Sequence, residues 1–261
     1  MKKLLCMITL IIAGFQPLES NGKAEDGKAE DNGSNKVMEE FEYKDKSAKE
    51  LRNYMVSKQI EMRGITDPKV LEAMRTVPRH KFVPEGQKAY AYEDSALRIG
   101  YGQTISQPYI VGLMTEILEI KAGDKVLEVG TGSGYQAAVL SKITENVYSV
   151  EIIEQLAERT NNILKELGYK EIKTKIGDGY YGWEEYAPFD GIIVTAAAAH
   201  IPPPLIDQLK PNGIMVVPVG KPYEVQTLMK VTKKKNGGIS TTQVLPVSFV
   251  PLTGNRNTGE K

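Results

Sequence analysis

The chain has 261 residues, enough for one large domain or two small ones with a sizeable hydrophobic core. Lys+Arg and Asp+Glu are both 33, so the net charge is zero, and the basic excess typical of nucleic-acid-binding proteins is lacking. One cysteine, Cys6, and two distant histidines, His80 and His200, rule out a disulfide framework and a Cys/His metal centre. We therefore expect a globular protein with no metal and no nucleic-acid partner.

The N-terminus has the pattern of a secretory signal peptide. Lys2-Lys3 precedes an apolar run from Leu4 to Phe15, and a basic start before about 7–15 apolar residues is typical of such signals. The run is shorter than the roughly 20 residues of a membrane-spanning helix. We expect residues 1–20 to direct export to the periplasm, with no stable membrane association after cleavage. The alternatives are a mis-assigned start codon and an uncleaved anchor.

A charged tandem repeat follows this segment. Gly22–Asp26 reads Gly-Lys-Ala-Glu-Asp and is repeated at once as Gly27–Asp31. Such a stretch has no apolar periodicity and cannot offset its ordering entropy by burial. The sequence therefore predicts a disordered linker over residues 21–40 and a folded domain over residues 41–261.

Residues from about 41 to 120 predict a helical part. Apolar residues spaced like one face of a helix come first: Leu51, Met55, Ile60 and Met62. Asp67 is then placed as the N-cap, and Pro68 as the first residue, of a second helix whose apolar face is Val70, Leu71 and Met74. A third helical stretch runs from Pro108 to about Leu118.

From Lys125 onward, short apolar or β-branched runs alternate with helices. The predicted strands are Lys125–Val129, Asn146–Val150, Ile172–Ile176, Phe189–Val194 and Gly213–Val219, with helices at Gln136–Lys142 and Glu154–Leu167. Two later runs, Val225–Val231 and Thr241–Phe249, predict an antiparallel hairpin at the sheet edge. The fold class is α/β, a Rossmann-like, mostly parallel, doubly wound sheet. Its core spans about 121–220, followed by C-terminal strands over 221–254.

A glycine loop joins the first of these strands to its helix. It reads Gly130-Thr131-Gly132-Ser133-Gly134, which is not the G-x-G-x-x-G spacing that brings a helix N-terminus to a pyrophosphate. S-adenosylmethionine (AdoMet) has no phosphate but carries a cationic sulfonium, to which a carboxylate such as Glu128 is suited. The loop therefore favours AdoMet and argues against an NAD-dependent oxidoreductase.

Two further acids follow the second and third strands. Glu151 lies 21 positions after Gly130, where an acid accepts hydrogen bonds from ribose hydroxyls. Asp178, between Gly177 and Gly179, is placed to accept a bond from the adenine amino group. The structural alternatives are a solvated strand end for Glu151 and an Asx-turn for Asp178.

Together with these motifs, several segments resemble the bacterial protein-L-isoaspartate O-methyltransferase family. They are Val77–Pro84, Gly102–Tyr109, Val126–Tyr135, Gly177–Gly179, Phe189–Ala196 and Phe249–Thr253. The second and the last of these are the most restricted to the family. The resemblance implies transfer of a methyl group from AdoMet to the free α-carboxylate of L-isoaspartyl residues in damaged proteins. The ester then closes to a succinimide, which starts repair.

The resemblance also implies roles for particular residues. Ser106 is the active-site serine, which we expect to orient the substrate carboxylate beside Val250 and Leu252. The residues expected to hold the cofactor are Thr104, Ile105, Glu128, Gly130, Thr131, Gly132, Gly134, Glu151, Asp178, Gly179 and Thr253. From the residues alone, Ser106 is equally well explained as part of a Ser-Gln-Pro turn. The expected partners are proteins carrying isoaspartyl residues, and the enzyme is expected to be a monomer.

Other distinctive residues are interpreted as structural. His80, beside Arg79, is interpreted as a packed loop residue rather than a carboxylate-binding group. Trp183 and the Tyr180-Tyr181 pair are expected in the core or at its rim, and Lys233–Lys235 at a solvated hairpin tip.

Two departures from the family leave alternatives open. Ala196–His200 has extra alanine and a histidine where a proline usually follows paired alanines, so substrate preference is open. The N-terminal extension differs from a family that is typically cytoplasmic. An AdoMet-dependent methyltransferase of a small-molecule carboxylate would share the glycine loop but not explain Ser106 or Phe249–Thr253. A non-catalytic binding module is the third hypothesis.

Overall fold

The computed structural model describes residues 46–254, which lie within one compact unit, Tyr43–Lys261. The predicted signal peptide (1–20) and linker (21–40) lie outside the described residues. Among the residues described, no helix has the length and apolar character needed to cross a membrane.

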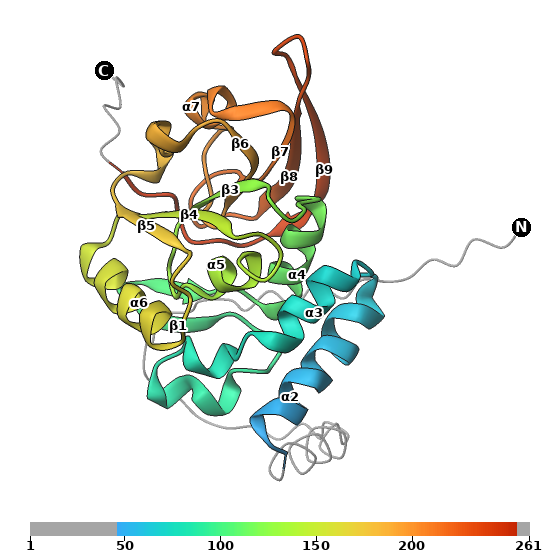
Figure 1. Ribbon diagram of the computed structural model, residues 1–261, viewed down its shortest axis with the longest axis vertical. Coiled ribbons are helices and arrows are strands. Elements are labelled where there is room, and N and C mark those ends of the chain that lie inside the picture. The colour runs from blue at the N-terminus through green and yellow to red at the C-terminus, as the bar shows by residue number, and fades with distance from the viewer. Residues whose placement is uncertain (1–45, 255–261) are drawn as a thin grey trace, which may run out of the picture. The chain divides into compact units, whose positions relative to one another are not determined.

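A seven-stranded sheet forms the centre of this unit, with strand order β5-β4-β3-β6-β7-β8-β9 (Figure 1). Its strands are β3 (Lys125–Val129), β4 (Asn146–Glu151), β5 (Lys173–Ile176), β6 (Phe189–Val194), β7 (Leu209–Val219), β8 (Gln226–Lys233) and β9 (Ile239–Val247). Strands β3 to β7 pair in parallel, whereas β8 and β9 are antiparallel. The predicted fold class is therefore confirmed, and the order reverses at β3, where such sheets bind ligands.

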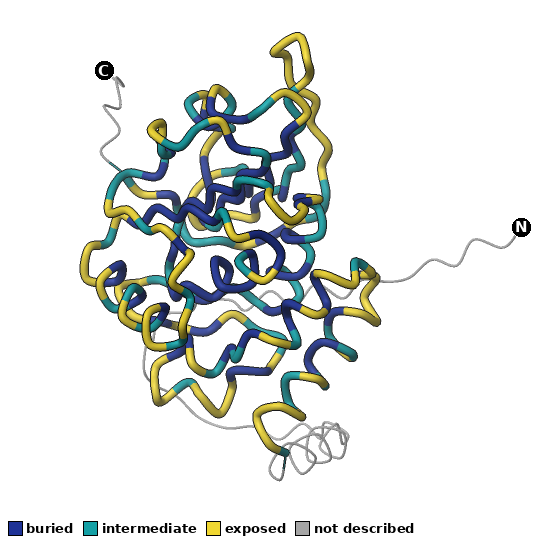
Figure 2. Tube along the Cα trace, in the orientation of Figure 1, coloured by how far each residue is buried: buried dark blue, intermediate teal, exposed yellow. Residues whose placement is uncertain are grey.

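Both faces of the sheet are covered. Neighbouring residues of β3 point to opposite sides: Val126 packs into a cluster with helices α4 (Pro108–Ile117), α5 (Tyr135–Leu140) and α6 (Glu154–Glu166), and Leu127 into a cluster reaching α7 (Pro203–Asp207). Figure 2 shows the strands at the centre of the unit as the most continuously buried part of the described chain. This double burial explains the uninterrupted apolar runs of the central strands.

The first helix changes its geometry along its length. Helix α2 (Ala48–Tyr54) begins with a capping box between Ser47 and Glu50, continues as a π-helix (Met55–Ile60) and ends in a 3₁₀ turn (Glu61–Arg63). Because π and 3₁₀ turns have different numbers of residues per turn, they rotate later side chains off the α-helical face. The prediction that Met62 shares the apolar face was therefore wrong, and this side chain is 72% exposed.

The second predicted helix is confirmed as α3 (Pro68–Thr76). The Asp67 carboxylate accepts a hydrogen bond from the Lys69 N–H at 2.8 Å, and Pro68 occupies the first turn. Its predicted apolar residues, Val70, Leu71 and Met74, are buried.

The sequence did not predict a two-stranded antiparallel sheet within the N-terminal part. It pairs β1 (Leu97–Gly100) with β2 (Gln103–Ile105). Its turn has positive φ at Gly100, Tyr101 and Gly102. The Arg159 guanidinium of α6 donates to the Ile99 carbonyl at 2.7 Å, which fastens this hairpin to the central unit.

The C-terminal hairpin is confirmed, but one of its lysines was interpreted wrongly. Lys233 ends β8, and its ammonium donates to the carbonyls of Ile206 and Asp207 at 2.8 and 3.0 Å. These carbonyls lie at the C-terminal end of α7, where a cation is favoured. Of the three lysines, Lys234 and Lys235 are the ones that lie in the exposed tip. Strand β7 also begins at Leu209, earlier than the predicted Gly213.

Candidate active site

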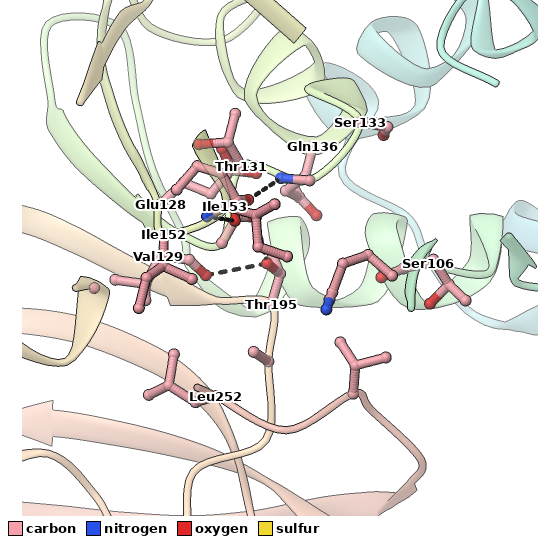
Figure 3. A pocket seen from close by; sticks show the side chains of 18 of the residues that line it. Ser106, Glu128, Val129, Thr131, Ser133, Gln136, Ile152, Ile153, Thr195 and Leu252 are labelled. Carbon is pink, nitrogen blue, oxygen red and sulfur yellow. Dashed lines mark hydrogen bonds between the residues drawn. The ribbon is translucent and has the colours of Figure 1, made fainter. Parts of the chain in front are cut away.

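A cavity lies at the carboxyl ends of β3, β4 and β6, beside the reversal of strand order (Figure 3). It holds about 730 Å³ of empty space, open solvent included, and it lies where open α/β sheets bind their ligands. Its walls come from segments far apart in the sequence: β2 and Ser106, the glycine loop, the start of the β4–α6 connection, and Val250–Thr253.

The cavity brings together most of the residues predicted from the sequence. Those that line it are Thr104, Ile105, Ser106, Glu128, Gly130, Thr131, Gly132, Glu151, Gly179, Val250, Leu252 and Thr253. Gly134 and Asp178 do not line it. Gly134 is the N-cap of α5, with φ +84°, and a side chain there would approach Thr160 to 2.7 Å. Its role is therefore to let α6 pack closely against the loop.

Gly130, the first residue of the glycine loop, is held by hydrogen bonds on both of its backbone polar groups. The Gly130 N–H donates to the Val150 carbonyl at 2.8 Å, and the Thr195 hydroxyl donates to the Gly130 carbonyl at 2.6 Å. Gly130 has φ +95°, and a Cβ there would lie 2.6 Å from the Thr195 hydroxyl oxygen. This position therefore requires glycine for both conformation and space.

Glu151 ends β4 with its carboxylate fixed in place. One oxygen accepts from the Gly132 N–H at 2.8 Å and the other from the Ile153 N–H at 3.0 Å. Each carboxylate oxygen can accept more than one hydrogen bond, and Glu151 lines the cavity. Glu151 is thus a buried and pre-oriented hydrogen-bond acceptor in the cavity wall, not a solvated strand end.

Glu128 lies in the cavity wall and is completely buried. Its Oε2 accepts a hydrogen bond from the Ser149 hydroxyl, which is in turn 2.6 Å from the Thr131 hydroxyl. Its Oε1 has no hydrogen bond within the described residues. Burial, reinforced by the nearby Glu151, raises the pKa of Glu128 to about 8, although the Ser149 bond opposes the shift. At neutral pH the ligand-free protein therefore holds this carboxyl mostly protonated.

Asp178 forms the Asx-turn that was the structural alternative for it. Its Oδ1 accepts from the Tyr180 N–H at 2.9 Å and caps the 3₁₀ turn Gly179–Tyr181. Its Oδ2 is buried and has no hydrogen bond to any described residue, and Gly254 packs so closely that a Cβ there would lie 2.1 Å away. In this conformation the C-terminal segment, rather than the cavity, faces the Asp178 carboxylate.

Ser106 faces the cavity from the loop between β2 and α4. It lies opposite Glu128 in Figure 3. No histidine lines the cavity within the described chain, so the Ser106 hydroxyl has no partner for nucleophilic activation. His80 is instead 2.6 Å from the Tyr92 hydroxyl, as expected for a packed loop residue.

The C-terminal segment completes the wall by pairing with the segment after β6. The Ala197 N–H donates to the Val250 carbonyl and the Leu252 N–H donates to the Ala197 carbonyl, both at 2.8 Å. Ala196, Ala197 and Ala198 are buried. Their small side chains allow this close backbone approach.

The charges of the cavity suit a cationic ligand. Among the described residues its lining includes the carboxyls of Glu128 and Glu151 but no lysine, arginine or histidine. Nor does any group of three or more His, Cys, Asp or Glu side chains with metal-site geometry occur between residues 46 and 254.

Comparison with known proteins identifies the family. The family model described as Protein-L-isoaspartate(D-aspartate) O-methyltransferase matches residues 49–257. Protein-L-isoaspartate O-methyltransferase 2 of Syntrophobacter fumaroxidans is 62% identical over 188 residues, covering 72% of this chain and 76% of the relative. Protein-L-isoaspartate O-methyltransferase 1 of Cupriavidus necator is 58% identical over 192 residues, 74% of each chain. The chain belongs to the protein-L-isoaspartate O-methyltransferase family.

Solved structures agree with this membership. A Plasmodium falciparum protein of the same description, in complex with S-adenosyl-L-homocysteine, matches with a TM-score of 0.67 at 30% identity, covering 77% of this chain and 98% of that one. A second protein-L-isoaspartate O-methyltransferase matches with a TM-score of 0.71 at 29% identity, covering 80% and 67%. The chain is an AdoMet-dependent methyltransferase that acts on isoaspartyl residues in damaged proteins for their repair.

Several residues that line the cavity were not predicted from the sequence. They include Gln103, Val111, Ser133, Tyr135, Gln136, Ile152, Ile153, Thr195 and Ala196. Thr195 follows β6 directly, so the strand-end signal that pointed to Glu151 would have found it as well. Gln136 gave no such signal, because it lies within α5 and not at a strand end. Its amide donates to the Thr115 hydroxyl of α4 at 2.9 Å.

Another residue that was not predicted packs against Tyr135 of the cavity wall. Arg79 is fully buried, donates to the Ala91 carbonyl at 2.8 Å and lies over the Tyr135 ring, 4.9 Å from its centre. Burial lowers the pKa of Arg79 to about 10. A charged side chain in this position fixes the aromatic ring that forms part of the cavity wall.

Proposed function

We propose that the cavity binds AdoMet along the glycine loop and places the isoaspartyl carboxylate against Ser106. Glu151 accepts hydrogen bonds from the ribose, the adenine lies toward Gly179 and Ile152, and the cationic methionine end lies toward Glu128. The fixed Glu151 carboxylate, two bonds from backbone N–H groups beside a close-approach glycine loop, is the observation that carries the assignment.

The donor set fits this cofactor. Two carboxyls face the cavity, one with an oxygen free of hydrogen bonds, and no cation lines it among the described residues. When bound, AdoMet supplies an activated methyl group and a neutral leaving group.

Under this proposal the protein's own residues position rather than activate the acceptor. The isoaspartyl α-carboxylate has an ordinary pKa near 3.5 and is ionised at neutral pH, so it needs no general base. The Ser106 hydroxyl donates a hydrogen bond to one carboxylate oxygen and points the other toward the methyl group. Such placement contributes up to roughly 7–11 kcal/mol to a rate enhancement.

The macromolecular partner follows from this chemistry. A protein or peptide reaches the site past Ser106 and the backbone of Val250–Thr253, and leaves as a methyl ester that closes to a succinimide. We expect the active form to be a monomer.

The N-terminal segment supports a separate proposal, export to the periplasm. Sequencing the mature N-terminus from fractionated cells tests it. Removal of the first 20 or so residues and recovery in the periplasmic fraction are expected, whereas an intact Met1 in the cytoplasmic fraction would contradict export.

The activity itself is tested with two peptides that differ only in Asp or isoAsp. Each is incubated with AdoMet labelled in its methyl group. Base-labile label on the isoAsp peptide alone is the expected result. AdoMet binding without transfer to either peptide would contradict the assignment and favour a binding module, and label on small carboxylates only would favour the small-molecule alternative.

A further inference from the structure

Glu128 is a buried acid that the transfer step itself does not use. It is fully buried in the cavity wall and one of its oxygens has no hydrogen bond within the described residues. A buried acid with an unsatisfied oxygen is costly to keep charged unless a cation lies nearby. A cationic ligand in the cavity would lower the cost of ionising Glu128.

Among the described residues, one charged group acts on Glu128. Across the sheet it is paired with Ser149 of β4 and Ile193 of β6, both uncharged. Helix α5 presents the backbone N–H of Ala137, and the charged group acting on it among the described residues is Glu151. Because Glu151 is also an acid, no cation among the described residues compensates a negative Glu128, and the Ser149 hydroxyl and the Ala137 N–H offset its burial only in part.

The hydroxyls beside Glu128 can serve both of its protonation states. Ser149 bonds Oε2, and either Ser149 or Thr131 can be the donor of the bond between them. When Glu128 is ionised, Thr131 donates to Ser149 and Ser149 donates to the carboxylate. When Glu128 is protonated, both bonds reverse by rotation of the hydroxyls. The Thr131 end lines the cavity, so this chain also connects the buried acid to the ligand space.

We propose that Glu128 is a proton-linked binding group for the cationic methionine end of AdoMet: it holds a proton in the free protein and releases it to solvent when AdoMet binds. The O–H bond of the carboxyl breaks, the proton leaves through the Thr131 side, and the carboxylate left behind faces the sulfonium and ammonium. S-adenosylhomocysteine has lost the sulfonium charge, so its binding releases a smaller fraction of a proton from Glu128. This inference rests on the proposed AdoMet site.

The coupling of proton release to binding favours AdoMet over S-adenosylhomocysteine. Raising the pH removes the proton in advance, so AdoMet affinity rises with pH, by up to tenfold per unit, until Glu128 is ionised in the free protein. Because the pKa of Glu128 is raised to about 8, AdoMet affinity should rise with pH up to about that value. Affinity for S-adenosylhomocysteine rises less, so the preference for AdoMet widens over the same range.

Calorimetry in buffers of different ionisation enthalpy counts the protons. The full chain is titrated with AdoMet and with S-adenosylhomocysteine at pH 7 in phosphate and in Tris. The cofactor's own amino group titrates in a similar range, about 7.7–8.0 for an ordinary α-amine. The decisive quantity is therefore the difference between wild type and Glu128→Gln, with the exposed Glu166→Gln of α6 as the matched control.

We expect wild type and Glu166→Gln to release close to one proton more per AdoMet than Glu128→Gln. AdoMet affinity in Glu128→Gln should lose its rise with pH and keep only the pH dependence of the cofactor's own amine. Ser149→Ala removes a bond that stabilises the ionised form, so it should move the affinity midpoint to higher pH. A merely structural Ser149 would leave that midpoint in place. Equal proton counts in wild type and Glu128→Gln, with AdoMet bound in both, would overturn the inference but leave the cofactor site intact. No AdoMet binding by wild type in any buffer would overturn the cofactor site and this inference together.

Discussion

The two sides of the cavity are built in different ways. The cofactor side comes from one continuous stretch, β3, the glycine loop and the end of β4, and is fixed by backbone hydrogen bonds to Glu151 and Gly130. The substrate side joins two segments far apart in the chain, β2 with Ser106 and the C-terminal Val250–Thr253. The first side is therefore specified locally, whereas the second depends on how the rest of the domain folds, and the two should respond separately to mutation.

The largest effect is expected on the cofactor side, at Gly130. Gly130→Ala places a Cβ where it would be 2.6 Å from the Thr195 hydroxyl, at φ +95°, and left-handed backbone costs a non-glycine residue about 1–2 kcal/mol before any clash. AdoMet binding measured by calorimetry should fall by more than about 100-fold. Adding Thr195→Ala removes the clashing oxygen and should restore part of the affinity. A single mutant that binds normally would show that the loop is not as constrained as described.

On the substrate side, Ser106→Ala should reduce turnover while leaving AdoMet affinity unchanged. The lost hydrogen bond is to a charged carboxylate, worth about 1.5–3 kcal/mol, or roughly 10- to 100-fold in kcat/KM for the isoAsp peptide. Steady-state kinetics with Ser141→Ala, a half-buried serine just after α5, gives the matched control. Equal turnover of Ser106→Ala and Ser141→Ala would remove Ser106 from the mechanism.

Glu151→Gln should weaken AdoMet binding and leave turnover unchanged, and its effect should be smaller than that of Ser106→Ala. One amide oxygen remains as an acceptor, but the charge that strengthens the ribose bonds is lost, so AdoMet Kd should rise about tenfold. Turnover at saturating AdoMet should stay near wild type. A fall in kcat at saturation with normal affinity would place Glu151 in the transfer step instead.

The smallest effect is expected at His200. This side chain is exposed and contacts the Tyr180 hydroxyl at 3.3 Å, outside the cavity lining. His200→Ala should leave AdoMet affinity and turnover of a short isoAsp peptide within about twofold, since exposed substitutions away from special features have effects within about 0.5 kcal/mol. A selective change with longer peptides would show that this departure from the family pattern sets substrate preference.

The same contrast explains what could be predicted from the sequence. The parallel strands and the glycine loop carry local signals, an apolar run followed by glycines and an acid, and β3, β6 and the loop were predicted at their observed places. The β1–β2 hairpin was missed because its strands are very short and its turn contains Tyr101 as well as glycines. The bond from Arg159 of α6 to the Ile99 carbonyl, which holds the hairpin in place, joins residues 60 positions apart and is encoded by no local pattern.

Which residues form the site was easier to predict than the protonation and the hydrogen-bond partners of their side chains. Glu128 was selected as a negative charge, but its ionisation depends on burial by elements distant in sequence. Asp178 was selected for the adenine, but its contact with Gly254 is made by the end of the domain. Position in a motif identifies which residues meet, whereas their protonation and partners follow from the packed structure.

The most direct test of two separable sides measures AdoMet affinity and kcat for Ser106→Ala and Glu151→Gln side by side in the full chain. The account predicts a double dissociation: lower turnover with normal affinity for Ser106→Ala, and weaker affinity with near-normal turnover at saturation for Glu151→Gln. Parallel losses of both quantities in both variants would contradict it.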